Sequence, residues 1–298
     1  MIASPIGWKR QAQAVLSLTR YQEYVVFVIV TTFLGAQVSA APIDGRLLLA
    51  LAANWLAVGF SFMINDVEDA ADDALNPAKV NRNPVSAGRL TPALGFAASF
   101  VVALLAAAAF FFLGPIPFWI GLACLAVGFL YSWRPVRFKR IPIFDFISHC
   151  MLLAGFQYLC AYFTFAPNGG GKWLAPFIFV TAVSMYGELF NEVRDLEGDR
   201  KAGVTHTAAV IGERATHVLM YVLLAVGGIA FSYSVIVGLI PAWVLGVLIA
   251  LGVVIMARPI LRMRRGSAVD LTGPLHVPIQ IVGALTMIAW VVGGLFGL

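Results

Sequence analysis

Two short acidic segments of the chain share one pattern, and each follows a long apolar stretch. The first runs from Asn65 to Asp73, and the second runs from Asn191 to Asp199, 126 positions later. Aligned, both read Asn, an acidic residue, Val, any residue, Asp, three further residues and Asp. Clustered carboxylates repel one another and are costly to desolvate beside a membrane, so they need a positive partner. Mg²⁺ held by carboxylates together with substrate phosphates would be such a partner.

Helical spacing places the side chains of each segment on one helix face. Asn65, Asp66, Asp69 and Asp73 stand at i, i+1, i+4 and i+8, which lie above one another on a helix. The second segment has the same spacing, begun one turn earlier by Glu188. A solvated helix end with ordinary surface acids would explain one such segment more easily than two. We therefore predict metal ligation by Asp66, Asp69, Asp73, Asn191, Asp195 and Asp199.

Basic side chains fall in the same set of connecting segments. They follow the first acidic segment, interrupt the chain between the two segments, and follow the second. Arginine and lysine bind phosphate oxygens through charge-assisted hydrogen bonds. We expect diphosphate binding by Asn65, Lys79, Arg82, Arg137, Lys139, Arg200 and Lys201.

The elements that position these residues are membrane helices. Of the 298 residues, 60% are hydrophobic and 12% charged, whereas soluble domains carry about 25% charged residues. Apolar runs of the length that crosses a bilayer recur throughout, and the short alternating segments of a β-barrel do not. We predict an all-α, polytopic helical bundle of nine spans in a single domain, 1–298. The spans are 24–42, 46–64, 93–113, 115–132, 143–165, 173–190, 216–239, 242–261 and 277–297.

The distribution of basic residues predicts the orientation of this bundle. All Lys and Arg residues except Arg46 and Lys172 lie on the side of the N-terminus, so the N-terminus is predicted to be cytoplasmic and the C-terminus outside. The acidic-motif loops 65–90 and 191–214 and the basic loop 131–142 then share the cytoplasmic side. Four intervening spans make the two halves parallel pseudo-repeats. The orientation also accounts for the net charge of +5 without a nucleic-acid partner.

At these residues the sequence resembles the UbiA superfamily of intramembrane prenyltransferases. The first motif, N-D-x-x-D-x-x-x-D, is intact from Asn65 to Asp73, and Lys79 to Gly88 resembles its basic continuation. The second, D-x-x-x-D, is Asp195 with Asp199, and Tyr131 to Lys139 is similar to Y-S-x-x-P-x-x-x-K. Two departures are Glu192, where some branches have Asp, and Asn83, which separates Arg82 from Pro84. The form D-x-E-G-D-R-x-x-G is similar to branches that act on chlorophyllide, homogentisate, carotenoid or archaeal lipid acceptors.

The resemblance implies Mg²⁺-dependent transfer of a prenyl group from an allylic polyprenyl diphosphate to a lipophilic or aromatic acceptor. Two Mg²⁺ ions would bridge the diphosphate, and membrane lipids would surround the enzyme, with no obligatory protein partner. Metal and cations would neutralise the leaving diphosphate. The apolar interior would keep water from the allylic cation. The catalytic residues implied are Asp66, Asp69, Asp195, Lys139 and Tyr131.

Other functions remain open at this level. The same scaffold would serve a terpene cyclase without an acceptor or a carotenoid elongase, and a polytopic bundle with acids at its edge would serve a cation-coupled transporter. Transport sites usually lie near the midplane, however, rather than at helix ends. Asp145 is expected to cap a helix, pair with Arg140 or act in catalysis. His149, Gln157 and Tyr162 would shape an acceptor pocket or pack between helices.

Overall fold

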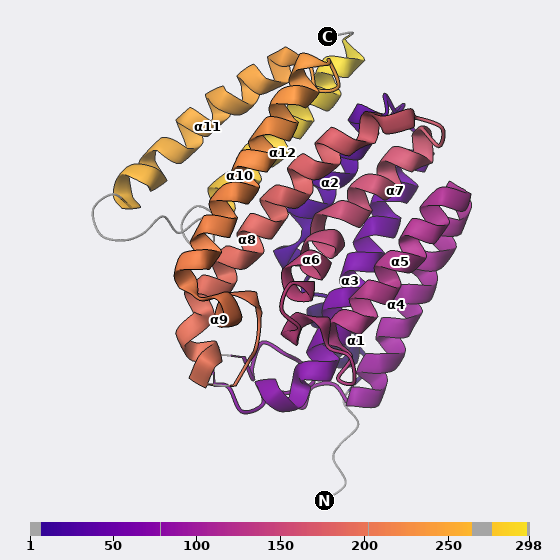
Figure 1. Cartoon of the computed structure of the whole chain (residues 1–298). Helices are drawn as coiled ribbons and strands as arrows, with labels where there is room; N and C mark the ends of the chain where they lie inside the picture. Colours follow the sequence, from indigo (N-terminus) through magenta and orange to yellow (C-terminus); the bar gives the residue numbers. More distant parts are fainter. Residues whose placement is uncertain (1–6, 78, 202, 264–275, 297–298) are drawn as a thin grey trace, which may run out of the picture.

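The computed structural model describes residues 7–77, 79–201, 203–263 and 276–296, and the secondary structure in these ranges is helical. Figure 1 shows the long helices side by side, with the two acidic segments at the lower end of the bundle. The α-helices are α1 (Trp8–Leu18), α2 (Val25–Val38), α3 (Gly45–Asp73), α4 (Pro92–Leu113), α5 (Pro115–Ser132), α6 (Phe144–Cys150), α7 (Phe156–Phe165), α8 (Leu174–Lys201), α9 (Thr207–Ile211), α10 (Glu213–Ile236), α11 (Ala242–Met263) and α12 (His276–Leu295).

The helices α3 and α8 are longer than a bilayer requires. Asp44 caps α3 by accepting hydrogen bonds from the backbone N–H groups of Arg46 and Leu47. The 29 residues of α3 extend about 43 Å at 1.5 Å per residue, against about 30 Å of hydrocarbon. Its surplus turns carry the first acidic segment, and α8, with 28 residues, carries the second in the same way. The helical spacing of the two acidic segments predicted helix there, and this is confirmed. Of the segments 65–90 and 191–214, only the parts after Asp73 and after Lys201 lie outside α3 and α8.

The prediction of about nine membrane spans is confirmed. Within the described ranges, eight helices are long and apolar enough to cross a bilayer. A ninth span forms only if Trp8–Glu23 and Val25–Val38 are counted together across a bend of 58°. The predicted first span, 24–42, is thus shorter than expected, because α2 has only 14 residues. Arg20, in the left-handed backbone region at φ 49°, separates α1 from the 3₁₀ turn Tyr21–Glu23.

The backbone departs from a regular α-helix at two points of the spanning region. Gly114, at φ 121°, ends α4 and starts α5, a backbone conformation that a side chain would strain. The predicted span 143–165 is interrupted by a π-helical turn, Met151–Gly155, between α6 and α7. Such turns are frequently found at functional sites.

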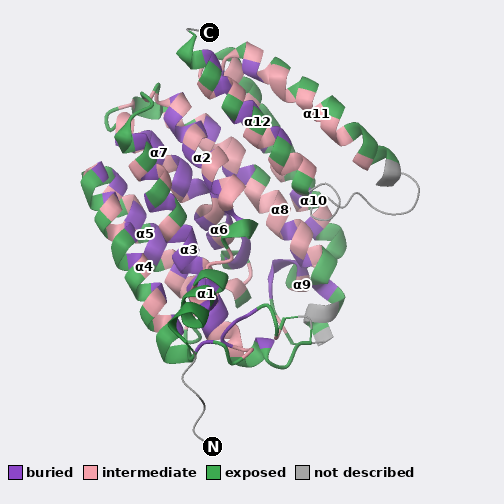
Figure 2. Cartoon of the chain, turned by 180° about the vertical axis from the view of Figure 1, so that it is seen from behind, coloured by how far each residue is buried: buried purple, intermediate pink, exposed green. Residues whose placement is uncertain are grey.

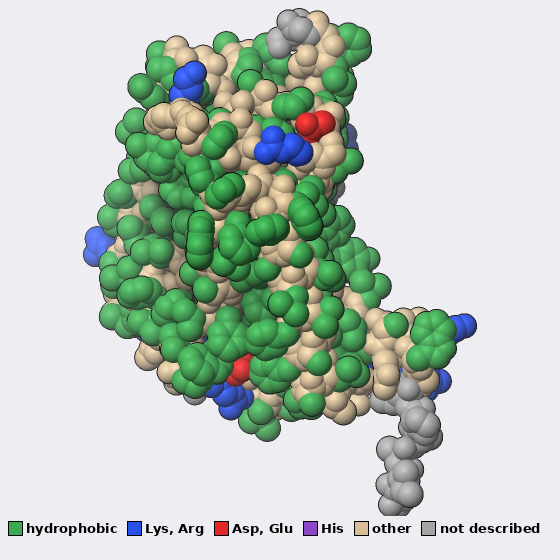
Figure 3. Space-filling model, turned by 90° about the vertical axis from the view of Figure 1, so that its right-hand side faces the viewer, with side chains coloured by type: hydrophobic (Ala, Val, Ile, Leu, Met, Phe, Trp, Pro, Cys, Tyr) green, Lys and Arg blue, Asp and Glu red, His purple; other side chains and the backbone are tan. Residues whose placement is uncertain are grey.

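The interior of the bundle is built around α3 and the α6–α7 span. In each of these two spans, 61% of the most apolar 18-residue stretch is buried. The corresponding share is 6% for Ala242–Leu261 in α11, which lies at the outside of the bundle (Figure 2). Helix α2 packs closely on α7, where a Cβ at Gly35 would stand 2.4 Å from the carbonyl oxygen of Tyr158. Hydrophobic side chains cover most of the face in Figure 3, and charged ones lie mainly near its ends. The chain is thus an integral, multi-pass membrane protein.

Candidate active site

The end of α3 and the turn after α5 form one charged cluster. Lys139 contacts Asp69 and also donates a hydrogen bond of 2.8 Å to Oδ1 of Asn65. Arg137 Nη2 lies 2.7 Å from Oδ1 of Asp69 and 2.8 Å from Oδ2 of Asp72. These contacts bring together four residues that the sequence predicted for the site. Asp72, within the first motif but outside its pattern, was not among them.

Backbone geometry of the basic turn fixes these cations in place. Arg137 has φ 52°, in the left-handed region, and a 3₁₀ turn, Phe138–Arg140, follows it. Burial lowers the pKa of Lys139, although the Asp69 carboxylate opposes this. Burial also acts to lower the pKa of Arg137, but its hydrogen bond and charge interactions with Asp72 and Asp69 raise it overall. Both side chains are held against carboxylates that need positive partners.

The carboxylate of Asp66 is fully buried and has a partner that the sequence did not reveal. Arg20 Nη1 lies 3.1 Å from Oδ1 of Asp66, and the same guanidinium donates to Glu23. Oδ2 of Asp66 is buried without a hydrogen-bond partner. Arg20 lies 46 positions before Asp66, so no spacing in the sequence pointed to this pair. Only the 58° bend after residue 23 brings the two segments together.

Asn83, the departure from the family pattern, ties the loop after α3 back onto that helix. Its side-chain amide donates one hydrogen bond of 2.7 Å to the backbone carbonyl of Asp66 and another of 3.0 Å to Oδ2 of Asp73. Its side-chain oxygen accepts from the backbone N–H of Val85 at 2.9 Å. Asn83 is fully buried. Asn83 therefore holds the loop against α3. Among the described residues, Asp73 is hydrogen-bonded to Asn83 and is not paired with a cation.

The second acidic segment is arranged differently from the first. Glu192 is buried, and its Oε2 accepts a hydrogen bond of 2.9 Å from the backbone N–H of Ala208. The same oxygen lies 3.2 Å from Nδ1 of His206. Its other oxygen, Oε1, is buried without a partner. Asp195 is half exposed and pairs with its neighbour Arg194 at 2.9 Å. Glu192 thus supports α9, whereas Asp195 faces outward from the helix.

Asp145 lies in the first turn of α6, whose N-cap is Ile143, and it holds α9 beside this helix instead of capping it. Its carboxylate accepts from the backbone N–H and the hydroxyl of Thr207, the latter at 2.6 Å, and from the backbone N–H of Phe146 at 2.8 Å. The expected partner Arg140 instead lies 3.8 Å from Asp72. Two buried carboxylates, of Asp145 and Glu192, therefore fix the segment that follows α8.

Tyr131, near the C-terminal end of α5, has acids from both long helices within electrostatic range. These are Asp69 on α3 and Glu188 and Glu192 on α8. The hydroxyl of the adjacent Ser132 donates 3.0 Å to Asn65. The C-terminal end of α5 therefore links the two halves of the candidate site, as a shared site requires.

The remaining predicted residues lie around this cluster without a common contact. Lys79, Arg82 and Arg200 are exposed, and Arg82 is within electrostatic range of Asp66. Asn191 donates a long hydrogen bond, 3.4 Å, to Glu188. The side chains of Asp199 and Lys201 lie outside the described residues.

The donor set is compatible with Mg²⁺, although the carboxylates face cations or amides in this structure. Among the described residues, no three His, Cys, Asp or Glu side chains are close enough to hold a metal together. The orphaned Oδ2 of Asp66 supplies one hard oxygen donor, and Asp69 beside it supplies further ones, the kind Mg²⁺ prefers. Exchange of Arg20, Arg137 and Lys139 from carboxylate to phosphate oxygens would free these donors.

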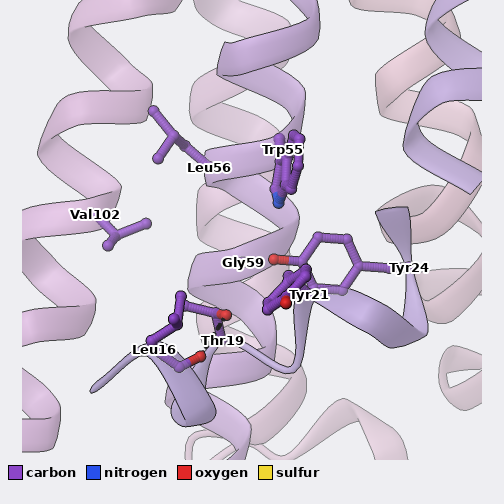
Figure 4. A pocket seen from close by; sticks show the side chains of 8 residues that line it. All are labelled: Leu16, Thr19, Tyr21, Tyr24, Trp55, Leu56, Gly59 and Val102. Carbon is purple, nitrogen blue, oxygen red and sulfur yellow. Dashed lines mark hydrogen bonds between the residues drawn. The ribbon is translucent and has the colours of Figure 1, made fainter. Parts of the chain in front are cut away.

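A separate groove opens beside α1, outside the charged cluster. Figure 4 shows its lining, which comes from α1, the turn after it, α3 and α4, and its volume is about 380 Å³. Leu16, Tyr21, Trp55 and Val102 contribute, and none of the eight lining residues is charged. The groove therefore lacks groups that bind diphosphate.

An intramembrane helical bundle with carboxylates and cations gathered at the ends of α3, α5 and α8 defines a class of membrane enzymes that handle phosphorylated lipids. Residues 24–272 match the UbiA prenyltransferase family. Because this match covers most of the chain, the protein belongs to the UbiA prenyltransferase family.

Individual relatives agree with this assignment. The chain is 30% identical over 227 residues to a lycopene elongase/hydratase of Haloferax volcanii, covering 74% of this chain and 71% of the relative. It is 25% identical to a digeranylgeranylglyceryl phosphate synthase of Methanothermobacter thermautotrophicus, covering 90% and 92%. The solved structure of a UbiA homolog from Archaeoglobus fulgidus bound to GPP and Mg²⁺ superposes with a TM-score of 0.74 at 21% identity, covering 94% of this chain and 98% of that one. At this identity the superposition supports the fold.

Proposed function

We propose that the protein catalyses Mg²⁺-dependent transfer of a prenyl group from an allylic polyprenyl diphosphate to a hydrophobic acceptor within the membrane. The observation that carries this proposal is the joint engagement of Asn65 and Asp69 by Lys139, with Arg137 also on Asp69. Carboxylates and cations already gathered in one place match the needs of a metal–diphosphate complex. The relative of known structure was solved with GPP and Mg²⁺, which is consistent with this use of the fold.

The protein's own residues have distinct tasks in this reaction. Asp66, Asp69 and Asp73 on α3, and Asn191, Asp195 and Asp199 on α8, would hold two Mg²⁺ ions, which neutralise the leaving diphosphate and so ease C–O cleavage. Lys139, Arg137, Arg82, Lys79, Arg200 and Lys201, with Asn65, would bind diphosphate oxygens. Tyr131, at the inner edge of this cluster, would lie beside the allylic carbon and exclude water from it.

Relatives suggest which acceptors to test. Their names point to three chemical classes: a prenylated glycerol phosphate, a polyene hydrocarbon and an acylated phenol. Transfer to a polyene is the second candidate function, because the Haloferax relative is a lycopene elongase/hydratase with 30% identity. Both candidates use the same metal–diphosphate site and differ only in the acceptor.

Product analysis tests the proposal. Purified protein in lipid nanodiscs with Mg²⁺ would be given labelled geranyl, farnesyl or geranylgeranyl diphosphate and one acceptor of each class. We expect a prenylated acceptor and free diphosphate, with both abolished by chelation of Mg²⁺. A labelled product formed equally well without any acceptor would identify a cyclase instead. Absence of diphosphate release with every chain length and every acceptor would refute the proposal. Uptake of cations by vesicles that contain the protein, without consumption of prenyl diphosphate, would indicate a transporter.

We further propose that the N-terminus and the site face the cytoplasm and that the C-terminus lies outside. Arg46 at the start of α3 and Lys172 before α8 lie at the bundle end opposite the acidic segments, and positive-inside bias then favours a cytoplasmic site. The three native cysteines are buried, so labelling of an introduced cysteine would have a low background. A membrane-impermeant maleimide on intact cells should label Lys172→Cys but not Leu75→Cys. The reverse pattern would refute the orientation.

A further inference from the structure

A second polar cluster lies one helical turn inside the acidic segments, between α5, α6 and α8. Nε2 of His149 lies 3.3 Å from Oε2 of Glu188. The ring of Tyr131 has its centroid 6.3 Å from that of His149. None of the metal–diphosphate roles described above uses the pair His149 and Glu188. Polar side chains within a membrane span are costly and usually functional.

The geometry of the pair leaves one imidazole nitrogen available. Glu188 is an acceptor, so Nε2 of His149 carries the proton toward it, and Nδ1 keeps its lone pair. No hydrogen bond to Nδ1 is found within the part of the chain that the structure describes. The side chains of His149 and Glu188 remain 25% and 14% exposed. The pair is therefore only partly covered by the protein.

From these observations we propose that His149 is the catalytic base that removes the proton of the acceptor, and that Glu188 is its positioning residue. This inference rests on the proposed prenyl transfer. An acceptor that is alkylated at a hydroxyl oxygen or an aromatic carbon must lose the proton that this atom carried, and the assignment concerns acceptors of this kind. Arg137 is always protonated, and Lys139 is held by Asp69 and assigned to the diphosphate, so neither is available to accept it. Histidine is the side chain best suited to accept a proton near neutral pH.

The proposed reaction transfers the prenyl group to the acceptor and one proton to His149. The bond between C1 of the prenyl group and the diphosphate oxygen breaks, and its electron pair leaves with the diphosphate. The acceptor oxygen or carbon forms a bond to C1, and the proton that it carried passes to Nδ1 of His149. The imidazolium is stabilised by the carboxylate of Glu188, and it then returns the proton to water. Tyr131, which the proposed function places beside the allylic carbon, has its ring centroid 6.3 Å from that of this base.

The charged surroundings of His149 favour this role. Glu188 faces it from α8, Tyr131 from α5, and Asp145 precedes it by one turn of α6. Asp145 is already occupied by Thr207, and Asn191 donates to Glu188. The Glu188 carboxylate, 3.3 Å from Nε2, holds the imidazole in its orientation. A merely structural histidine would not require a free Nδ1.

Single-turnover experiments would separate proton removal from diphosphate binding. Wild type, His149→Gln, His149→Ala and Glu188→Gln would be compared in nanodiscs with Mg²⁺, labelled geranylgeranyl diphosphate and the acceptor that wild type prenylates. Positioned general bases contribute about 100-fold or more, so we expect at least that loss for both His149 variants and a smaller loss for Glu188→Gln. Binding of geranylgeranyl thiolodiphosphate with Mg²⁺ should be unchanged. Added imidazole should restore transfer by His149→Ala but not by Glu188→Gln.

The matched control is His217→Gln on α10, which should behave as wild type. Normal transfer by His149→Gln, or a loss in His149→Ala that imidazole does not restore while analogue binding weakens, would overturn the assignment alone. A wild-type protein that consumes no prenyl diphosphate with any acceptor would overturn the proposed function, and this assignment with it.

Discussion

The guanidinium of Arg20, which follows α1, lies 3.1 Å from the buried carboxylate of Asp66 on α3. A cation from the N-terminal segment thus neutralises the most buried acid of the first acidic segment, whose second oxygen has no hydrogen-bond partner among the described residues. A buried carboxylate left without its cation is strongly destabilising. Because Mg²⁺ bound at Asp66 would supply the same positive charge, protein cation and metal are expected to compete for this residue.

Arg20→Ala tests this competition. Without Mg²⁺, the variant should lose about 3 kcal/mol of stability, the usual cost of breaking a buried pair. Added Mg²⁺ should raise its melting temperature more than that of wild type, because the metal replaces the missing charge. The measurement is thermal unfolding in detergent with and without Mg²⁺, and Arg10→Ala, an exposed change on α1, is the control. An equal Mg²⁺ effect on wild type and Arg20→Ala would contradict metal binding at Asp66.

Asn83→Ala should loosen the loop that follows α3. The substitution removes hydrogen bonds to the Asp66 carbonyl, to Asp73 and to the Val85 N–H. Each buried hydrogen bond contributes on the order of 1 kcal/mol, so we expect a loss of about 2–3 kcal/mol. Limited proteolysis should then cut the segment 74–91 faster than in wild type. Asn81→Ala, an exposed position in the same loop, should leave the cleavage rate unchanged. Faster cleavage of Asn81→Ala as well would mean that the loop loosens on any substitution, and that the hydrogen bonds of Asn83 are not its specific anchor.

Much of this architecture could be predicted from the sequence, and the failures have identifiable causes. Apolar runs predicted the spans well, because a bilayer demands them. They ended α3 at residue 64 because hydropathy stops there, whereas the helix continues through the charged turns to Asp73. Helical spacing predicted which acids share a face but not their partners. Arg20 and Thr207 lie far along the chain from Asp66 and Asp145, and only the tertiary structure brings them close.

The two acids that follow Asn191 should respond differently to substitution. Glu192 is buried and holds the backbone of Ala208, so Glu192→Ala should lower stability by about 2 kcal/mol, since it removes a charged hydrogen-bond acceptor. Asp195 is half exposed and paired only with Arg194 within the described residues, and exposed pairs contribute little to stability. Asp195→Ala should therefore keep the wild-type melting temperature but lose Mg²⁺-dependent diphosphate release by at least about 100-fold, as expected for a metal ligand. Retained turnover in Asp195→Ala would remove this residue from the site.

Lys139 and Asp69 provide a test of how cations change partners when substrate binds. Lys139→Gln, Asp69→Asn and the double variant form a double-mutant cycle on thermal stability. Residues in direct contact show coupling energies of about 0.5–3 kcal/mol, and we expect coupling in this range for the protein without ligand. With Mg²⁺ and geranylgeranyl thiolodiphosphate bound, the coupling should fall, because Lys139 would contact phosphate oxygens and Asp69 would contact metal. A Lys139–Asp69 coupling that is the same with and without ligand would mean that the ion pair persists during the reaction, and Lys139 would then be a structural support of α3 rather than a diphosphate ligand.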